Sequence, residues 1–249
     1  AHLLHYKAFV QYIRYNPNKE TSPNNLDEYY NLWTRASFDA FANYTKSLGQ
    51  HNLKLMVGTH AEDYNYGYLR GGRKSFPNNK LTDIDAGDRS TQTNEGSTQA
   101  LSMVSGFGRI NYDYAGKYLL EANFRADASS RFAEGYRWGY FPSFSAAWRL
   151  SKEAFLQPLY PVLSDLKLRA SWGLLGNQEA LRDYYPAINT YSITPSYPMG
   201  GTLLGGYAQT QLKLKDISWE KSENMGFGLD FGFFGGRLTG SLDLYKRKT

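Results

Sequence analysis

The stretch "YLLEANFRADA", residues 118–128, alternates apolar and polar side chains with a period of two. The apolar positions are Tyr118, Leu120, Ala122, Phe124, Ala126 and Ala128, and after Leu119 the positions between them are Glu121, Asn123, Arg125 and Asp127. This period predicts a β-strand with one apolar face and one charged face. In a soluble sandwich the apolar face would pack on a core, whereas in a transmembrane barrel it would meet lipid and the polar face would line a wet lumen.

The composition narrows the choice of protein class. The chain has 249 residues, of which 41% are hydrophobic, and no run approaches the roughly 18 apolar residues of a spanning helix. It contains 21 Tyr and 24 Gly, which favours many strands and tight turns. The absence of Cys excludes a disulfide framework and thiolate metal sites. The formal charge of +5 is spread along the chain, so nucleic acid is not indicated as a partner.

Nine strand-like runs follow one another along the chain. We predict strands at about 4–15, 33–46, 52–63, 99–114, 117–129, 139–150, 165–176, 223–233 and 237–247. Most of these runs exceed the usual strand length of about five or six residues. A tilted barrel strand needs about 9–11 residues to cross a bilayer. The lengths therefore favour an all-β, antiparallel transmembrane barrel.

The connections between these runs differ between the two ends of the predicted sheet. At one end, three of four connections are long and polar, and the longest cover about 64–98 and 177–217. At the other end, three of four are short: "LGQH" (48–51), Ala115-Gly116 and "FGGR" (234–237). The exception, 151–164, has room for one amphipathic turn around Glu153–Leu156. Short turns at one end and long loops at the other are typical of outer-membrane barrels, and soluble sandwiches show no such asymmetry.

The alternation assigns side chains to the two faces of the sheet. We expect these to face lipid: Leu120, Ala122, Phe124, Leu168, Ala170, Phe227 and Leu229. We expect these to face the lumen: Glu121, Arg125, Lys167, Arg169 and Asp230. Aromatic residues towards the strand ends would anchor the barrel at the two membrane interfaces, namely Trp33, Tyr44, Tyr112, Tyr114, Tyr118, Trp148 and Trp172.

Two loops contain candidate substrate-binding residues. The 177–217 loop contains five tyrosines whose rings could stack on sugar rings or peptide side chains: Tyr184, Tyr185, Tyr191, Tyr197 and Tyr207. The alternative is that these tyrosines pack the loop on itself or lie in the interfacial belt. The stretch "SSRFAEGYRW" (129–138) adds Arg131 and Trp138, with local pairing of Arg131 and Glu134 as the structural alternative.

Catalytic and metal-binding patterns are weak. "TDIDAGD" (82–88) has Asp88 and Asn94 where an EF-hand loop requires its sixth-position Gly and its twelfth-position Glu. The four histidines lack metal-ligand spacing, and there is no nucleophile elbow or P-loop. The sequence indicates neither an enzyme nor a cofactor.

Five stretches at ordered spacing carry a family resemblance. They are "SSRF" (129–132), "GYFPSFSAAWRLS" (139–151), "LKLRASWGLLGNQ" (166–178), "WEKSENMGFGLDFGFFGGRL" (219–238) and "DLYKRKT" (243–249). The chain resembles the barrel of a SusC/RagA-type TonB-dependent outer-membrane transporter from Bacteroidetes. The resemblance implies a barrel of about 22 strands with a plugged lumen. Residues 1–249 would then be part of one barrel domain in the outer membrane, an interior piece whose plug lies outside the chain.

The same resemblance implies the partners. A SusD-like surface lipoprotein would help to capture glycan or peptide oligomers, and the TonB complex would act through the absent N-terminal part. Two other functions stay open at this point: an adhesive or structural β-sandwich module, and a passive porin of the cell envelope. Detergent dependence separates the sandwich from either barrel, and an N-terminal plug separates the transporter from the porin.

Overall fold

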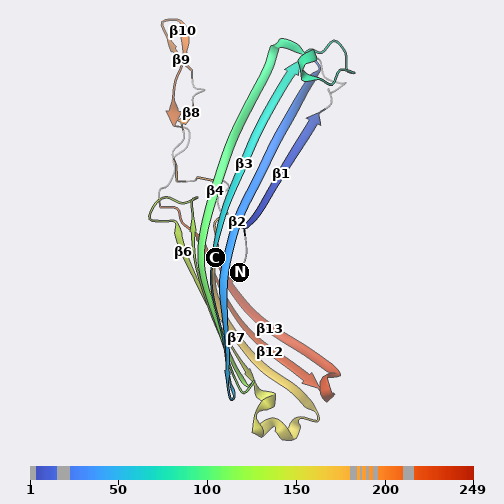
Figure 1. The fold of residues 1–249 in the computed structure, drawn as a ribbon, viewed down its shortest axis with the longest axis vertical. Helices are drawn as coiled ribbons and strands as arrows, with labels where there is room; N and C mark the ends of the chain where they lie inside the picture. The colour runs from blue at the N-terminus through green and yellow to red at the C-terminus, as the bar shows by residue number, and fades with distance from the viewer. Residues whose placement is uncertain are drawn as a thin grey trace. The chain divides into compact units, whose positions relative to one another are not determined.

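A computed structural model describes residues 4–15, 23–179, 184–185, 187–188, 191–192, 196–209 and 216–249, with only the backbone described for 4–15, 192, 196–197 and 203–204. Its main element is an antiparallel sheet of nine strands in the order β1-β2-β3-β4-β5-β6-β7-β12-β13 (Figure 1). The bounds are β1 Leu4–Tyr15, β2 Asn25–Leu48, β3 His51–Lys74, β4 Asp88–Tyr114, β5 Tyr118–Ser129, β6 Trp138–Arg149, β7 Leu163–Asn177, β12 Glu220–Phe233 and β13 Leu238–Lys248. All nine predicted strands are present, and each pairs with its neighbour in the sheet, as a meander requires.

The remaining described elements are short. Four two- to four-residue strands lie in the connection between β7 and β12: β8 Tyr191–Ser192, β9 Ser196–Met199, β10 Thr202–Gly205 and β11 Ala208–Gln209. Four 3₁₀ helices lie in other connections: η1 Ile84–Ala86, η2 Leu150–Lys152, η3 Ala154–Leu159 and η4 Phe234–Gly236. No helix in the described part of the chain is both long and apolar enough to cross a membrane.

The chain divides into two compact units. The first unit contains residues 39–60 and 103–249, and the second contains 2–38 and 61–102. In the first unit, β4 to β7, β12 and β13 form consecutive antiparallel pairs. In the second unit, residues from β1 to β4 lie on strands that are adjacent in the sheet.

The predicted tight turns are set by residues with positive φ. Ala115 and Gly116 have φ values of 55° and 64°, the combination that a two-residue type I′ hairpin requires. The Lys117 N–H donates to the Tyr114 carbonyl and closes this turn. Gly235 and Gly236 have φ values of 69° and 86° in the turn between β12 and β13. These turns fix the register of the strand pairs that they connect.

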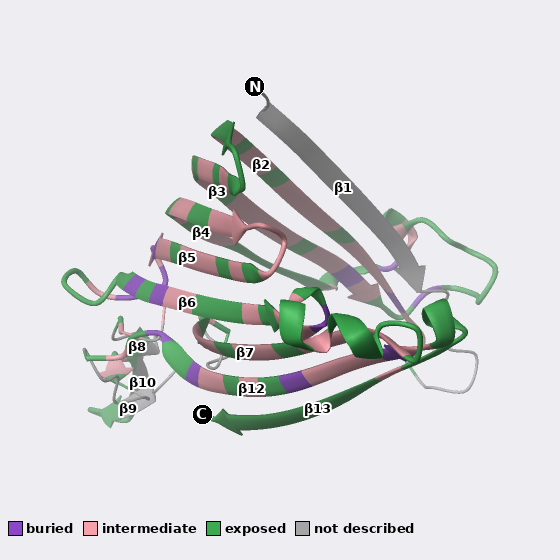
Figure 2. Cartoon of the chain, turned by 90° about the horizontal axis from the view of Figure 1, so that it is seen from below, coloured by how far each residue is buried: buried purple, intermediate pink, exposed green. Residues whose placement is uncertain are grey.

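The register keeps each side-chain face continuous across the sheet. Phe124 on β5 lies opposite Gly108 on β4 and Pro142 on β6, and Arg125 lies opposite Phe107 and Phe141. The apolar face is not covered by a second layer in the described residues: Phe124 is 50% exposed and Phe227 is 66% exposed. Figure 2 shows buried residues at only a few places along the strands. A soluble sandwich would bury this face, so the structure contradicts that alternative.

The apolar face of β6 has the height of a membrane-spanning band. Its alternate residues run from Trp138 to Trp148, which is about 33 Å along a strand that rises about 3.3 Å per residue. With a strand tilt of about 40°, this length corresponds to a band about 25 Å tall, the height of the apolar band of outer-membrane barrels. At the Trp148 end of this band, the rings of Tyr114, Tyr118 and Trp148 stack across β4, β5 and β6, with neighbouring centroids 6.2 Å apart in both contacts. These three rings, all of which belong to the predicted interfacial belt, thus lie together at one end of the band.

The sequence-based strand lengths are wrong for β2, β3 and β4. The predicted loop at 64–98 is instead the outer part of β3 and β4, and only residues 75–87 connect them. The stretch 25–31, also predicted as loop, belongs to β2. These outer segments contain few aliphatic residues, and their alternate apolar positions are mostly tyrosines, so their sequence resembles that of polar loops. Cross-strand contacts stabilise them, for example the two ion pairs of Arg70 with Asp27 and Glu95.

The exceptional connection at the short-turn end is helical, as expected, but as two 3₁₀ pieces. η2 and η3 flank Glu153, where a single amphipathic turn was predicted. The Glu153 carboxylate accepts hydrogen bonds from Lys117 Nζ at 3.0 Å and from Trp148 Nε1 at 3.1 Å. These bonds lower the pKa of Glu153 below its usual value, and the bond from Lys117 has the largest effect.

The exposed apolar face predicts the effect of adding a charge to it. Phe124→Arg should lower the free energy of unfolding by about 2–4 kcal/mol, because hydrocarbon cannot solvate the charge of an Arg that lies on the lipid face near the bilayer midplane. The measurement is urea unfolding of the full-length protein in lipid vesicles. Ser145→Arg is the matched control, because Ser145 lies opposite Glu121 on the polar face. Equal losses in both variants would contradict a lipid-facing Phe124.

Candidate functional site

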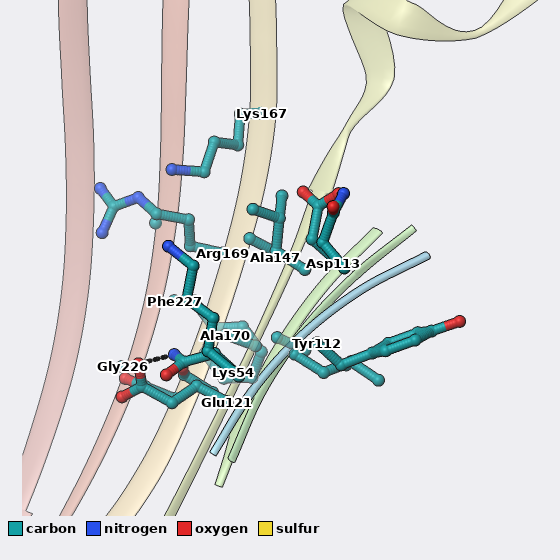
Figure 3. A pocket seen from close by; sticks show the side chains of 18 of the residues that line it. Lys54, Tyr112, Asp113, Glu121, Ala147, Lys167, Arg169, Ala170, Gly226 and Phe227 are labelled. Atoms are coloured by element: carbon teal, nitrogen blue, oxygen red, sulfur yellow. Dashed lines mark hydrogen bonds between the residues drawn. The ribbon is translucent and has the colours of Figure 1, made fainter. Parts of the chain in front are cut away.

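The polar face of the first unit forms a concavity of about 880 Å³. Its lining includes Lys54 on β3, Glu121 on β5, Lys167 and Arg169 on β7, and Asp243 on β13 (Figure 3). These side chains occupy alternate positions on their strands, so the sheet presents them all on one face. The concavity is therefore lined by charges of both signs that come from strands distant in sequence.

Arg169 ties three strands together on this face. Its guanidinium donates to both carboxylate oxygens of Asp230 on β12, at 2.8 and 2.9 Å, and Nη2 also donates to Asp243 on β13 at 2.9 Å. Lys167 Nζ lies 3.6 Å from the same Asp230 carboxylate. Gly228 makes this reach possible, because a Cβ there would lie 2.6 Å from the Arg169 Cζ. Each pair is partly exposed and therefore screened by solvent, so the network sets register more than it adds stability.

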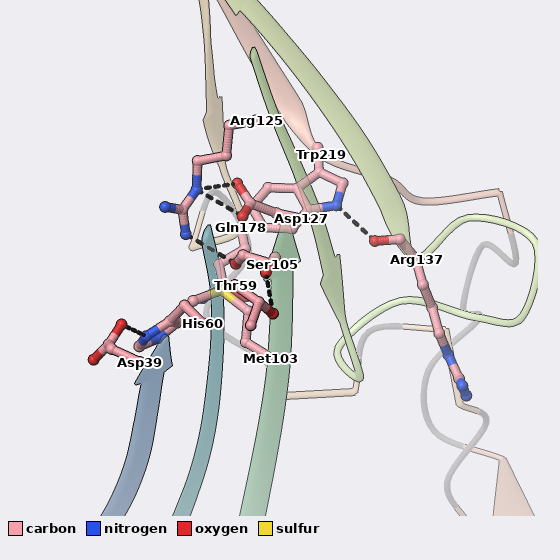
Figure 4. A network of polar contacts seen from close by, with 10 residues as sticks. All are labelled: Asp39, Thr59, His60, Met103, Ser105, Arg125, Asp127, Arg137, Gln178 and Trp219. Atoms are coloured by element: carbon pink, nitrogen blue, oxygen red, sulfur yellow. Dashed lines mark hydrogen bonds and ion pairs between the residues drawn. The ribbon is translucent and has the colours of Figure 1, made fainter. Parts of the chain in front are cut away.

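A second polar network lies on the same face towards the long-connection end (Figure 4). Arg125 Nε donates to Asp127 at 2.7 Å, and its Nη2 donates to the Ser105 hydroxyl at 2.9 Å. Asp127 and Ser105 are 6% and 1% exposed, so this pair is largely removed from water. Nearby, Glu121 accepts hydrogen bonds from the side-chain amides of Asn111 and Asn123. The five residues predicted to face the lumen thus share one face, and each is hydrogen-bonded or ion-paired on it.

An aromatic cluster closes the long-connection end of the polar face. Phe132, Phe141 and Trp219 are buried together, and the ring centroid of Trp219 lies 5.5 Å from Phe132 and 5.4 Å from Phe141. The indole Nε1 of Trp219 donates to the Arg137 carbonyl at 2.8 Å. Gly176 leaves space for the Phe141 ring, which would lie 2.1 Å from a Cβ at that position. The cluster fastens the last residues of the 178–219 connection to the 130–137 hairpin loop.

The predicted loop residues are placed differently from one another. Arg131 is 6% exposed, and its guanidinium carbon lies 5.2 Å from the ring centroid of Tyr184, so these two predicted residues meet. Tyr191 and Tyr207 are 63% and 80% exposed. Tyr185 is half-buried.

Two further predicted residues stand apart from this group. The side chain of Tyr197 lies outside the described residues; its backbone pairs with Leu204. Trp138 lies opposite Ala128 on the apolar face and is 52% exposed. The structure therefore puts Trp138 on the face opposite to that of Asp127.

Sequence reasoning missed an aromatic surface in the second unit. Trp33 on β2 stacks on Tyr66 of β3 with centroids 5.3 Å apart, and Tyr29 lies 6.3 Å from Tyr68 on the same pair of strands. The guanidinium carbon of Arg70 lies 5.3 Å from the Tyr29 centroid. These side chains form what we call the aromatic ladder: Tyr29, Trp33, Tyr66, Tyr68 and Arg70.

Charges around the aromatic ladder are paired. The Tyr68 hydroxyl donates to Glu95 on β4 at 2.8 Å, and Arg70 Nη1 donates to the same carboxylate at 3.2 Å. These bonds lower the pKa of Glu95, and the bond from Tyr68 has the largest effect. The signal in the sequence was the period-two repeat of Tyr64, Tyr66 and Tyr68, which lay inside an expected loop. Alternating tyrosines in a polar segment could have identified it as a strand.

The buried Trp219 predicts how firmly the long connection is held. Trp219→Ala should cost about 3–5 kcal/mol of local stability, because it removes a large buried side chain and its hydrogen bond. Limited proteolysis of the full-length protein in membranes should then cut within 178–219 faster than in the wild type. Trp219→Phe, which keeps most of the packing, is the control. Cleavage unchanged in Trp219→Ala would show that the cluster does not hold this connection.

Comparisons with known proteins agree with this geometry. A family model described as "TonB dependent receptor-like, beta-barrel" matches residues 3–249. The TonB-dependent receptor SusC of Bacteroides thetaiotaomicron is 36% identical over 235 residues, which cover 88% of this chain and 21% of SusC. The TonB-dependent receptor P3 of Formosa agariphila is 33% identical over 230 residues, 89% of this chain and 22% of P3. This chain therefore spans about a fifth of the length of these curated relatives.

Solved structures show the same fold. The RagAB peptide transporter superposes with a TM-score of 0.83 at 25% identity, over 98% of this chain and 27% of that chain. The RagAB peptide importer in its "open-open" state gives a TM-score of 0.81 at 26% identity, over 98% of this chain and 27% of that chain. The match covers the nine-stranded sheet almost completely.

Proposed function

Because this chain belongs to the TonB-dependent receptor-like β-barrel family, we propose that it forms the wall of an importer that carries nutrient oligomers across the outer membrane. The chain is part of an outer-membrane β-barrel, of the SusC/RagA type found in Bacteroidetes. Import is an activity of a whole transporter, and these residues span about a fifth of the length of the curated relatives.

One observation carries the proposal: a continuous polar face lies directly behind an exposed apolar band. Glu121, Arg125, Lys167, Arg169 and Asp230 share that polar face. In a closed barrel they would line the lumen, since the opposite side meets lipid. Their charges are satisfied by neighbours on the sheet, so the wall stays wet and ordered without a ligand. Such a wall suits a passage for polar oligomers.

Recognition of the oligomer would occur at the long-connection end. Tyr191 and Tyr207 offer exposed rings there, and Tyr184 is positioned by Arg131. In the second unit the aromatic ladder supplies a further row of rings with polar groups beside them. Aromatic faces stack on sugar rings and on peptide side chains alike, so glycan and peptide oligomers are both substrates in this proposal. The RagAB structures are described as those of a peptide transporter, which supports the peptide option.

The coupling partners in this proposal are those that the family resemblance implies. A SusD-like lipoprotein would meet the transporter at its surface end, and the TonB complex would supply energy through a plug that lies outside these residues. No catalytic step is assigned to the chain, because in the described residues the charged side chains of the polar face pair with one another. The protein acts by binding and passage.

The exposed tyrosines predict a graded loss of uptake. Each stacking contact contributes about 0.5–1.5 kcal/mol beyond burial, so single Ala substitutions should weaken uptake only slightly. The combined substitution of Tyr184, Tyr185, Tyr191 and Tyr207 by Ala should lower oligomer uptake by about tenfold or more, if two or more rings contact the substrate. The measurement is growth of cells on the oligomer as sole carbon or nitrogen source, with the full-length transporter. Outer-membrane abundance is measured in parallel.

A second set of variants separates the two aromatic surfaces. Trp33→Ala with Tyr66→Ala removes one stack of the aromatic ladder and leaves the 178–219 connection intact. Tyr140→Ala, which removes an exposed ring from the apolar face of β6 and belongs to neither aromatic surface, is the control for general damage. Unchanged uptake in both multiple variants at equal abundance would remove both surfaces from the substrate path.

A further inference from the structure

An apolar patch projects from the short-connection end of the first unit. It consists of Phe155, Leu159, Tyr160 and Val162 from the β6–β7 connection, with Phe234 and Leu238 from the β12–β13 turn. Their exposed fractions lie between 51% and 65%. We call these six residues the end patch. Large apolar side chains gathered at such exposure on a loop mark a binding surface.

The two parts of the end patch are joined by the backbone. The Phe234 N–H donates to the Val162 carbonyl at 2.8 Å, which holds η4 against the end of the β6–β7 connection. Leu238 begins β13 opposite Phe233, and the same face continues along β13 through Leu242. That face is the lipid-facing band. The end patch is therefore continuous with an apolar surface that already meets lipid.

The start of the connection is fixed to the outer side of the sheet. Glu153, the residue before η3, accepts a hydrogen bond from Trp148 Nε1 at 3.1 Å, and the Trp148 ring stacks on Tyr118. Lys117 Nζ bonds the same carboxylate at 3.0 Å. η3 thus leaves the sheet at the level where aromatic rings meet lipid headgroups.

Basic residues adjoin both parts of the end patch in the sequence. Lys152 precedes η3, with its Nζ close to Gly116 of the β4–β5 turn, and Arg237 follows η4. Cations beside exposed aromatic and aliphatic side chains are the signature of segments that lie in the plane of a membrane interface, where the cations meet phosphate headgroups. The basic residues and the exposed apolar side chains therefore both favour a lipid bilayer as the surface that contacts the end patch.

We propose that the end patch anchors this part of the barrel in lipid. Residues 154–162, with Phe234 and Leu238, lie in the interfacial region of the bilayer leaflet at the short-connection end. The anchor accounts for the one connection at that end that is not short. It would fix the depth and tilt at which this part of the wall sits. This is a property of membrane seating and is independent of what the barrel transports.

Site-specific fluorescence measures the position of the end patch. The 249 residues contain no Cys, so Phe155→Cys and Leu159→Cys, each labelled with the environment-sensitive dye NBD, report single positions. Cysteines elsewhere in the full-length transporter are replaced by Ser, and the protein is reconstituted into phosphatidylcholine–phosphatidylglycerol vesicles. One set of vesicles carries nitroxide-labelled lipid, and iodide serves as the aqueous quencher.

Two matched positions calibrate the signal. Leu244→Cys on the apolar face of β13 reports lipid, and Glu134→Cys in the 130–137 loop reports water. At the end patch, lipid nitroxide should quench as strongly as at Leu244, and more strongly when it lies near the headgroup than near the chain end. Iodide quenching should be at least about fivefold weaker than at Glu134.

Each other outcome overturns the anchor. Iodide quenching equal to that at Glu134 would place the end patch in water. Protection from both quenchers would mean that protein, such as a plug or a periplasmic partner, covers it. Tyr160→Cys, measured in the same way, replaces either variant if that variant fails to assemble.

Discussion

The pairing of main-chain N–H and C=O groups is the constraint on which the rest of this structure depends. Inside a bilayer no water replaces a missing partner, so every strand that crosses must be hydrogen-bonded along its length to a neighbour. The consecutive antiparallel pairs from β4 to β13 meet this requirement within the described residues. The outer edges of β1 and β13 have the same need, which the further strands of the family's barrel would meet.

Once the backbone is paired, the side chains of each face suit the medium that this face meets, which is lipid on one side and water on the other. On the lipid side the chain places rings and aliphatic groups that need no partners. On the other side it places acids, bases and amides that satisfy one another in short networks. Gly228 shows how closely the two requirements are linked, because the missing side chain lets Arg169 cross β12 and hold β13 in register. A polar wall built in this way does not depend on any one ion pair.

The sequence predicted the sheet well because the membrane imposes its period on the side chains. Within the apolar band the alternation marks each strand to within a few residues, and Ala115-Gly116 marks its turn by backbone preference. Beyond the band lipid no longer requires aliphatic side chains, and β3 alternates tyrosines with mostly polar or small residues, so Tyr64 to Arg70 resembled a loop. The candidate site was harder for a related reason. Contacts such as Arg131 with Tyr184, or Trp219 with Phe141, join segments far apart in sequence, and no local pattern encodes them.

The length of the connection between β7 and β12 bears on the order in which the sheet forms. Residues 178–219 separate these two strands, whereas residues 234–237 separate β12 from β13. Closing a loop about ten times as long costs about 2 kcal/mol more in chain entropy, and contacts distant in sequence form more slowly. The β12–β13 hairpin can therefore form as a unit before it finds β7. The contacts of Trp219 with the 130–137 loop would offset part of that entropy cost. The aromatic cluster would then also help β12 to pair with β7 during folding.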